Sequence, residues 1–249
     1  MSTRNALSFL ALWNGISGPD MQAEYEMWHT FEHVPERVGF PGFVEARRYR
    51  SITQPLRYYT CYWLENAGAL ATPQYRDVVE NPTPWSARMR LHMRDFLRMP
   101  CSMGGMHGNS PAARLIALHL QSDDDNAGQR IDTALRQLVS RASLVNAQWG
   151  EAQPADDYPL ANTTAGAGAR NQLARHQFVV MIGHLDDAVL TSATQVLLQS
   201  LASHTTPVSP PDHCEFLSQV RHADLATPTG TRQPPRADLL ATFTQGDKP

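Results

Sequence analysis

The sequence predicts an α+β fold in which two units with the element order β-α-β-β-α-β follow each other in one chain. Two observations predict it. Strand patterns and amphipathic helix patterns alternate in the same order in both halves, and the first strand and helix of one half are offset by a common spacing from those of the other. Leu7 and Leu115, for example, lie 108 positions apart in the first strand of each half. Since the helices of such a unit cover one face of its sheet, the bare faces of two units tend to pack together.

The predicted ferredoxin-like units cover residues 1–108 and 109–226, and a flexible tail follows over 227–249. In the first unit, apolar runs with β-branched or aromatic residues predict strands over 7–13, 43–50, 57–64 and 94–103. We expect Gly104 and Gly105 to end the last of these strands. Three helices are expected, over the segment after residue 20, over 69–80 and over 83–93.

In the second unit, the same patterns predict strands over 114–120, 144–150, 176–184 and 214–221. One amphipathic helix follows the acidic run 123–126, which supplies an N-cap, and another follows the cap at Asp186 and Asp187. A long loop rich in alanine, glycine, asparagine and threonine is expected over 153–174. From Thr227 onward the sequence is proline-rich and polar, which is typical of a loosely held tail.

Composition narrows the classes of function. The chain is 42% hydrophobic and 18% charged with a net charge of −3, so it is an ordinary globular sequence without the dense basic patch that nucleic acids or anionic membranes require. No apolar run approaches the roughly 18 residues of a membrane span, and no signal-peptide pattern is present. Its cysteines are far apart and lack a C-x-x-C pattern, which predicts reduced thiols in a cytoplasmic protein: Cys61, Cys101 and Cys214.

The stretch from His29 to Arg37 carries the densest set of ionisable groups. It holds two histidines, two glutamates and an arginine within nine residues. On a regular helix His29, Glu32 and His33 share one side, while an apolar stripe on the other side is available for packing. Pro35 lacks an N–H and disfavours helical geometry at the preceding residue, so we expect the helix to end or kink at Val34.

Several motifs between residues 5 and 100 together resemble uncharacterised members of the dimeric α+β-barrel superfamily, near its EthD-like branch. They are Trp13-Asn14, Trp28-His29-x-x-Glu32-His33-x-Pro35-Glu36-Arg37, Pro41-Gly42-Phe43, Arg47-Arg48-Tyr49 and Pro82-Thr83-Pro84-Trp85. The resemblance implies that the two units form a dimeric-type α+β barrel within one chain. It also implies a pocket between the sheet and the helices of the first unit, beneath the His29 face. The second unit carries no such motif and is expected to be degenerate.

That superfamily includes cofactor-free cyclases, decarboxylases, isomerases and monooxygenases of aromatic and polyketide-like substrates. We therefore expect a cofactor-independent lyase, cyclase or isomerase acting on an aromatic or polyketide-like acid. His29 or His33 would move the proton, since imidazole titrates near neutral pH, and Glu32 would orient it or act as a second acid. Guanidinium groups match a carboxylate or an enolate oxygen, which favours Arg37, Arg47 and Arg48 as substrate-binding residues.

Four further residues complete the predicted substrate site. The resemblance suggests Asn14 as a polar group of the pocket, and Tyr25 lies on the His29 face of the helix. On the strand over 57–64, alternation places Tyr58 and Tyr62 on one face and Tyr59 and Trp63 on the other. The sequence leaves open which face lines the pocket, so both Tyr59 and Tyr62 remain candidates.

Several alternatives stay open. The protein could bind a small molecule without catalysis, and the charges of Glu36 with Arg37 or Arg48 could hold the helix to the sheet. The string His29-x-x-Glu32-His33 also matches an inverted zinc-protease signature, although no third ligand stands out. One histidine could instead ligate haem, as in haem-binding relatives of the fold. We expect no cofactor, no metal and a small-molecule partner, and the sequence leaves a homodimer open.

Overall fold

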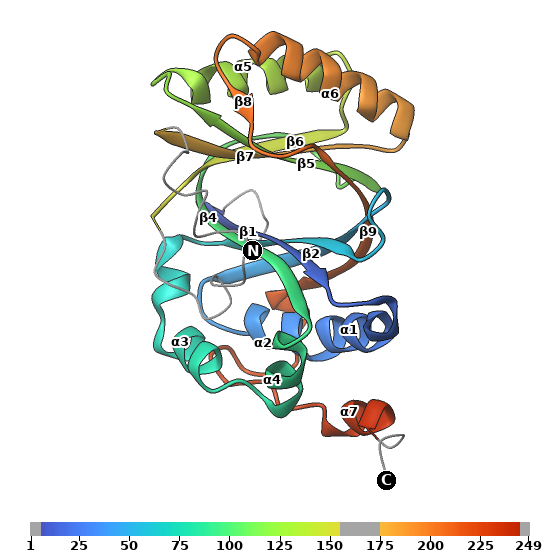
Figure 1. Ribbon diagram of the computed structural model, residues 1–249. Helices are drawn as coiled ribbons and strands as arrows, with labels where there is room; N and C mark the ends of the chain where they lie inside the picture. The colour runs from blue at the N-terminus through green and yellow to red at the C-terminus, as the bar shows by residue number, and fades with distance from the viewer. Residues whose placement is uncertain (1–5, 155–174, 245–249) are drawn as a thin grey trace.

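The computed structural model describes residues 6–154 and 175–244 of the chain. It has an α+β fold built around a closed barrel of eight antiparallel strands (Figure 1). The strands are β1 (Ser8–Ile16), β2 (Phe43–Ser51), β3 (Arg57–Leu64), β4 (Met93–Gly108), β5 (Arg114–Ser122), β6 (Asn146–Ala152), β7 (His176–His184) and β9 (Asp212–Arg221). The short strand β8 (Thr206–Pro207), which the sequence did not predict, pairs with β5 beside β9.

Strand order is the same in the two halves of the barrel. In the first half it is β4-β1-β3-β2, and in the second half it is β9-β5-β7-β6. The halves join twice, where β2 pairs with β9 and where β4 pairs with β6. Each half thus closes the hydrogen-bonded edges of the other, which leaves the barrel without a free edge.

Helices cover the outside of the barrel on two opposite sides (Figure 1). On one side lie the helical elements of the first half. They are η2 (Pro19–Met21), α1 (Gln22–Trp28), the π turn η3 (His29–His33), α2 (Val34–Val38), η4 (Ala67–Ala71), α3 (Pro73–Glu80) and α4 (Pro84–Arg90). On the other side lie α5 (Ala127–Ser140) and α6 (Asp187–Leu201). After β9 follow η6 (His222–Asp224) and α7 (Ala237–Thr244), which lies beside α1 and α4.

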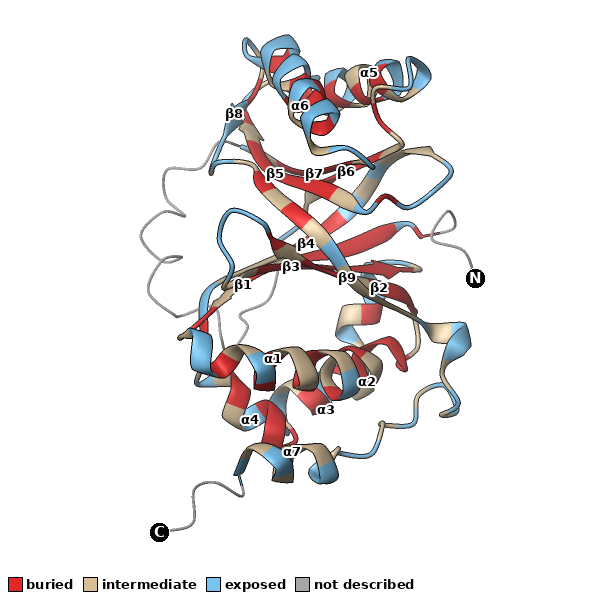
Figure 2. Ribbon diagram, turned by 90° about the vertical axis from the view of Figure 1, so that its right-hand side faces the viewer, coloured by how far each residue is buried: buried red, intermediate tan, exposed pale blue. Residues whose placement is uncertain are grey.

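Buried side chains form three layers (Figure 2). The barrel interior is filled mainly by aromatic residues and by sulfur-containing ones such as Cys61 and Met99. An apolar layer between the barrel and α5 and α6 is densely packed. The layer beneath the first-half helices differs, since it contains many buried polar residues, including Asn14, His29 and Glu36. In the described part of the chain no helix is long and apolar enough to cross a membrane.

The structure corrects two predicted boundaries in the first half. Strand β4 continues through Gly104 and Gly105 to Gly108 instead of ending there. A Cβ at Gly104 would lie 2.4 Å from the side chain of Trp149, so this glycine makes room for an aromatic ring rather than a turn. The helix expected over 69–80 is divided into η4 and α3. Thr72, which lies between them, has extended backbone geometry, and its side chain caps α3 by accepting from the N–H of Tyr75.

The tail expected from Thr227 onward is also different. As far as residue 244 it packs on the helices of the first half. Its backbone bonds to the residue that follows α2, with the N–H of Gly230 donating to the carbonyl of Gly39 at 3.1 Å. In α7, the ring of Phe243 lies 6.2 Å from that of Trp85. Residues 245–249 and most of the loop expected over 153–174 lie outside the described residues.

Candidate active site

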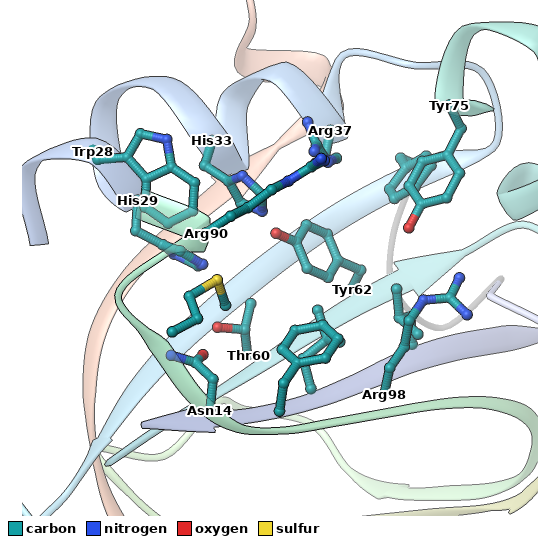
Figure 3. A pocket seen from close by; sticks show the side chains of 15 residues that line it. Asn14, Trp28, His29, His33, Arg37, Thr60, Tyr62, Tyr75, Arg90 and Arg98 are labelled. Atoms are coloured by element: carbon teal, nitrogen blue, oxygen red, sulfur yellow. The ribbon is translucent and has the colours of Figure 1, made fainter. Parts of the chain in front are cut away.

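A cavity lies between the first-half helices and the outer face of the barrel, where the sequence placed the pocket (Figure 3). We call it the inner cavity. The cavity is narrow. Its empty space measures about 550 Å³ when the open mouth is included, but the centres of water molecules can occupy only about 30 Å³ of it. That is room for about two or three waters, or for a group the size of a carboxylate. Its walls are Leu10, Leu12, Asn14, Trp28, His29, His33, Arg37, Phe43, Thr60, Tyr62, Tyr75, Arg90, Met93, Phe96 and Arg98.

The π turn η3 brings both histidines to this cavity. The N–H of Val34 donates to the carbonyl of His29, five residues earlier, so the turn is one residue wider than in an α-helix. His33 therefore lies almost directly beneath His29, with ring centroids 5.0 Å apart and an angle of 28° between the planes. Pro35 follows at the start of α2, where its missing N–H costs no hydrogen bond. The predicted kink at Val34 is thus a widened turn after which the helix restarts.

The two histidines are neutral bases in a buried environment. His29 is 3% exposed, and the Nδ1 atoms of His29 and His33 are both buried without a hydrogen-bond partner. Burial lowers the pKa of His29 well below its usual value, and the positive charges of Arg48 and Arg37 lower it further. Burial likewise lowers the pKa of His33, with Arg37 as the next cause. An imidazole in this state is free to accept a proton from a bound molecule.

These depressed pKa values predict how stability depends on pH. Below pH 6.5 the unfolded chain binds protons that the folded His29 and His33 do not, so stability should fall as the pH drops. Each histidine contributes up to about 1.4 kcal/mol per pH unit. We expect the melting temperature to fall more steeply between pH 6.5 and 5 in the wild-type protein than in a His29→Gln/His33→Gln variant.

Other histidines titrate in the same pH range, and comparison with this variant cancels their contribution to the pH dependence of stability. The pKa of His119 is also lowered by burial, whereas hydrogen bonds to Glu151 and Asp125 raise that of His176. Both contributions are present in the two proteins. Equal slopes in scanning calorimetry would contradict the neutral, buried state of the pair.

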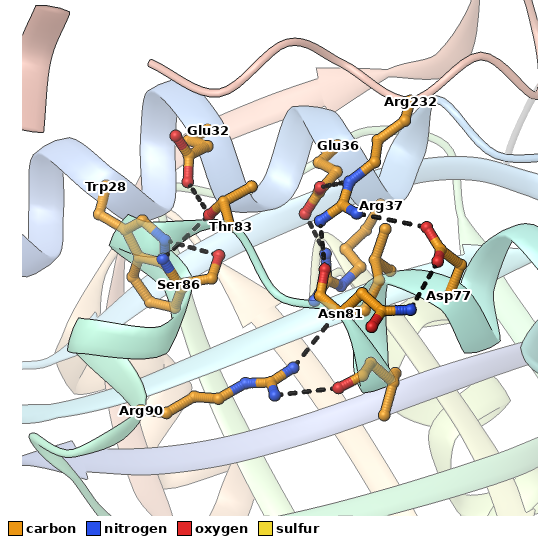
Figure 4. Close-up of polar contacts among 12 residues, drawn as sticks. Trp28, Glu32, Glu36, Arg37, Asp77, Asn81, Thr83, Ser86, Arg90 and Arg232 are labelled. Atoms are coloured by element: carbon orange, nitrogen blue, oxygen red, sulfur yellow. Dashed lines mark hydrogen bonds and ion pairs between the residues drawn. The ribbon is translucent and has the colours of Figure 1, made fainter. Parts of the chain in front are cut away.

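Arginines supply the charge of the inner cavity. Arg37, Arg90 and Arg98 line it, and none of the lining residues is an aspartate or a glutamate. Arg90 donates to the carbonyl oxygens of Val79 at 2.9 Å and Val78 at 3.3 Å, so neutral groups hold it in place (Figure 4). Arg37 forms a buried ion pair with Glu36. A cavity with this lining favours an anion, and guanidinium groups match the oxygens of a carboxylate or an enolate.

Glu32 lies away from the histidines, contrary to the sequence prediction. Its Oε1 accepts from the Thr83 hydroxyl at 2.5 Å (Figure 4), and its Oε2 accepts from the backbone N–H of Arg236 at 2.7 Å. The prediction assumed regular helical spacing, and the wider π turn rotates Glu32 out of the histidine face. Both carboxylate oxygens serve to join α4 and the C-terminal segment to this turn. The alternative role expected for Glu36, a structural pair with Arg37, agrees with the structure.

Asn14 and Tyr62 line the inner cavity as expected, and Tyr25 supports it from behind. The Tyr25 hydroxyl donates to Asn14 Oδ1 at 3.1 Å, and its ring stacks on His29 at 5.2 Å. Burial raises the pKa of Tyr25 to about 12, which keeps this donor protonated. Arg48 is buried beneath α1, where it bonds to Thr30 and Glu26 instead of lining the cavity.

Arg47 and Tyr59, which the sequence also placed at the site, lie in the barrel interior. Arg47 pairs with Glu45 at 2.7 Å and lies over the ring of Trp63, and the Tyr59 hydroxyl donates to Met181 Sδ at 2.8 Å. The predicted alternation along β3 is confirmed, because Thr60 and Tyr62 face the cavity on the opposite side of the strand. The sequence could not assign the faces, since both are buried.

Sequence reasoning missed Thr60, Tyr75, Arg90 and Arg98 among the polar residues of the cavity. Thr60 could have been predicted, because it shares a face with Tyr62 on a correctly predicted strand. The others come from α3, α4 and β4, and no spacing in the sequence relates them to His29. Only the packing of these elements around the same cavity makes them part of the site.

The residues present do not fit haem or zinc in this cavity. A porphyrin ring is far larger than the carboxylate or carbonyl head of an acid and does not fit a cavity this narrow, although His29 or His33 could serve as an axial ligand. For zinc, the histidine pair lacks a third ligand because Glu32 is held by Thr83 and Arg236. Among the described residues, no three or more His, Cys, Asp and Glu side chains gather where they could hold a metal ion.

Comparison with known proteins shows the fold. No family model and no curated protein matches the sequence. An anthrone oxidase-like protein matches the structure with a TM-score of 0.64 and 6% identity, over 90% of this chain and 97% of its own. A candidate monooxygenase from Fusobacterium nucleatum matches at 0.54 and 6%, over 87% and 95%. Chlorite dismutase from Candidatus Nitrospira defluvii matches at 0.51 and 9%, over 86% and 92%. This chain therefore has the fold of the dimeric α+β-barrel proteins.

Proposed function

We propose that this protein is a cofactor-independent enzyme that moves a proton on an anionic aromatic or polyketide-like acid, as a lyase, cyclase or isomerase does. One observation carries the proposal. Two neutral histidines whose buried Nδ1 atoms have no partner line the same cavity as three arginines, and that lining contains no carboxylate. Leaving such polar atoms buried without partners costs stability, so their presence favours a role other than folding.

The chemistry follows from the groups in the cavity. His29 or His33 accepts a proton from a C–H bond next to the carbonyl of the substrate, and the electron pair of that bond moves onto the carbonyl oxygen as an enolate. Arg37 and Arg90 stabilise the negative charge that develops there. The anionic substrate itself favours the protonated imidazole, since an opposite charge nearby raises its pKa. The protonated histidine then returns the proton to the same carbon or to another one.

A non-catalytic binding protein is the second candidate, and the same arginines favour it. The two candidates differ in what the polar groups do. Paired groups build a scaffold, as Glu32 and Glu36 do, whereas the histidines face the cavity with an atom left unpaired. Catalysis uses that free atom and binding alone does not.

Three finer predictions accompany this proposal. The shared strand order of the two halves supports the division into ferredoxin-like repeats at residues 1–108 and 109–226, with the site in the first. Membership of the EthD-like branch rests on the sequence motifs alone. A homodimer stays open as well.

Deuterium incorporation tests the proposed activity. Phenylpyruvate and benzoylacetate are small anionic aromatic acids with a proton next to a carbonyl group. We expect the purified protein, with no metal or cofactor added, to exchange that proton in D₂O at a rate proportional to its concentration, as followed by NMR. Binding without exchange, seen as a change in tryptophan fluorescence that Trp28→Phe at the cavity wall removes, would favour the binding protein. Absence of both would contradict an anion site.

A further inference from the structure

A second, wider cavity opens beside the inner cavity. We call it the outer groove. It lies between η4, α3 and β4, and its walls include Leu70, Ala71, Val79 and Pro100. It offers about 310 Å³ for the centres of water molecules, against about 30 Å³ in the inner cavity. Two residues, Tyr75 and Arg98, belong to the walls of both, so the two spaces meet at these side chains.

The junction is built from fixed elements. Tyr75 is 6% exposed, its ring stacks on Phe43 at 5.6 Å, and its backbone N–H is capped by Thr72 at the start of α3. Arg98 is on β4 opposite Leu12 of β1, which also lines the inner cavity. In Figure 3 the Tyr75 hydroxyl and the Arg98 guanidinium lie at one end of the inner cavity, far from Asn14 and His29. A molecule that extends from the histidines toward the groove therefore reaches these two side chains.

The two chambers differ in size and in their charged groups. Around the histidines the inner cavity carries arginines without a carboxylate and has little room. The outer groove has apolar side chains on its wall, such as Leu70 and Val79, together with polar ones, and its charged residues Arg76 and Glu80 are exposed at the rim. A compact anionic head suits the first chamber, and an apolar chain suits the second because its burial there removes apolar surface from water.

We propose that the outer groove is the second half of the substrate site and binds an apolar chain attached to the anionic head. Arg98 and Tyr75 flank the neck of the molecule, where Arg98 also attracts the anionic head. The substrate is thus an extended amphipathic acid rather than a small one. This inference rests on the proposed function, since it takes the inner cavity as the place of the anionic head.

Alkylbenzoates of increasing length test the groove by calorimetry. We expect 4-butylbenzoate to bind about 15- to 250-fold more tightly than benzoate, on the order of 2- to 4-fold for each of the four carbons buried. Ala71 is exposed on the groove wall, so Ala71→Phe should fill the groove without disturbing the core. That variant should lose the gain from the butyl chain and keep the affinity for benzoate.

Ala202→Phe is the matched control, because Ala202 is exposed beyond the end of α6 on the opposite side of the barrel. It should bind both ligands as the wild-type protein does. Arg98→Met should weaken benzoate about 10-fold and leave the uncharged 4-butylbenzamide unchanged, and Arg98→Lys should restore part of the loss.

The outcomes separate this inference from the proposed function. Benzoate binding with no gain from the alkyl chain, or a gain that Ala71→Phe leaves intact, would overturn the outer groove alone. If Arg98→Met weakens the binding of benzoate and of the uncharged 4-butylbenzamide alike, the role of the Arg98 charge is overturned. No benzoate binding at all would contradict the anionic head site, and with it both.

Discussion

The His29→Phe variant is expected to have a melting temperature equal to or above that of the wild-type protein. Its proton-exchange rate should fall at least about 100-fold. The rate falls because a general base typically contributes 10²- to 10⁴-fold, and phenylalanine cannot accept a proton. Stability is kept because a ring still packs on Tyr25, and a buried Nδ1 atom without a partner is removed. Removing that polar atom is worth roughly 1 kcal/mol, or a few degrees.

Exchange of deuterium into phenylpyruvate and scanning calorimetry measure the two effects. His33→Phe should behave in the same way if His33 takes part in the transfer. Glu32→Gln should keep the rate, since its carboxylate bonds to Thr83 and to the backbone of Arg236 outside the cavity. His184→Ala in the second half should keep it too. A His29/His33 double phenylalanine variant with the wild-type rate would show that the site lies elsewhere.

The Arg232→Ala variant is expected to lower stability by about 2–3 kcal/mol, or roughly 4–10 °C in melting temperature. Arg232 Nε donates to Oε1 of Glu36 at 2.7 Å, and Glu36 is only 1% exposed (Figure 4). Without Arg232, the buried carboxylate of Glu36 still pairs with Arg37 but loses its second cationic partner. Arg232 also joins α2 to α3 through Asp77 and the carbonyl of Asn81, so the variant loosens two elements at once.

Arg236→Ala is the matched control in the same segment. The Arg236 side chain pairs with exposed Asp238, and only its backbone N–H reaches Glu32, so the substitution keeps the buried contact. Its melting temperature should stay at the wild-type value. Equal melting temperatures for the two arginine variants would show that the C-terminal segment does not hold the helix that carries the histidines.

Local signals in the sequence predicted most of the strands and the capped helices. Strand β3 begins and ends where its apolar run does, at Arg57 and Leu64. Asp186 caps α6 as expected, since its side chain accepts from the N–H groups of Ala188 and Val189. These features depend on residues that are near one another in the chain, which is why spacing and residue type suffice to predict them.

The sequence by itself determined the α+β class and the histidine pair as the candidate base, while the place of the cavity beneath them came from the resemblance to the dimeric α+β barrels. Only the tertiary structure decided that Glu32 leaves the histidine face, because a π turn depends on how His29 to Val34 pack rather than on their identities. It also decided that Arg90 and Arg98 line the cavity and that Arg232 closes over Glu36. These groups come from distant parts of the chain, and the free energy that joins them arises from burial and charge pairing in the folded state, which no local pattern records.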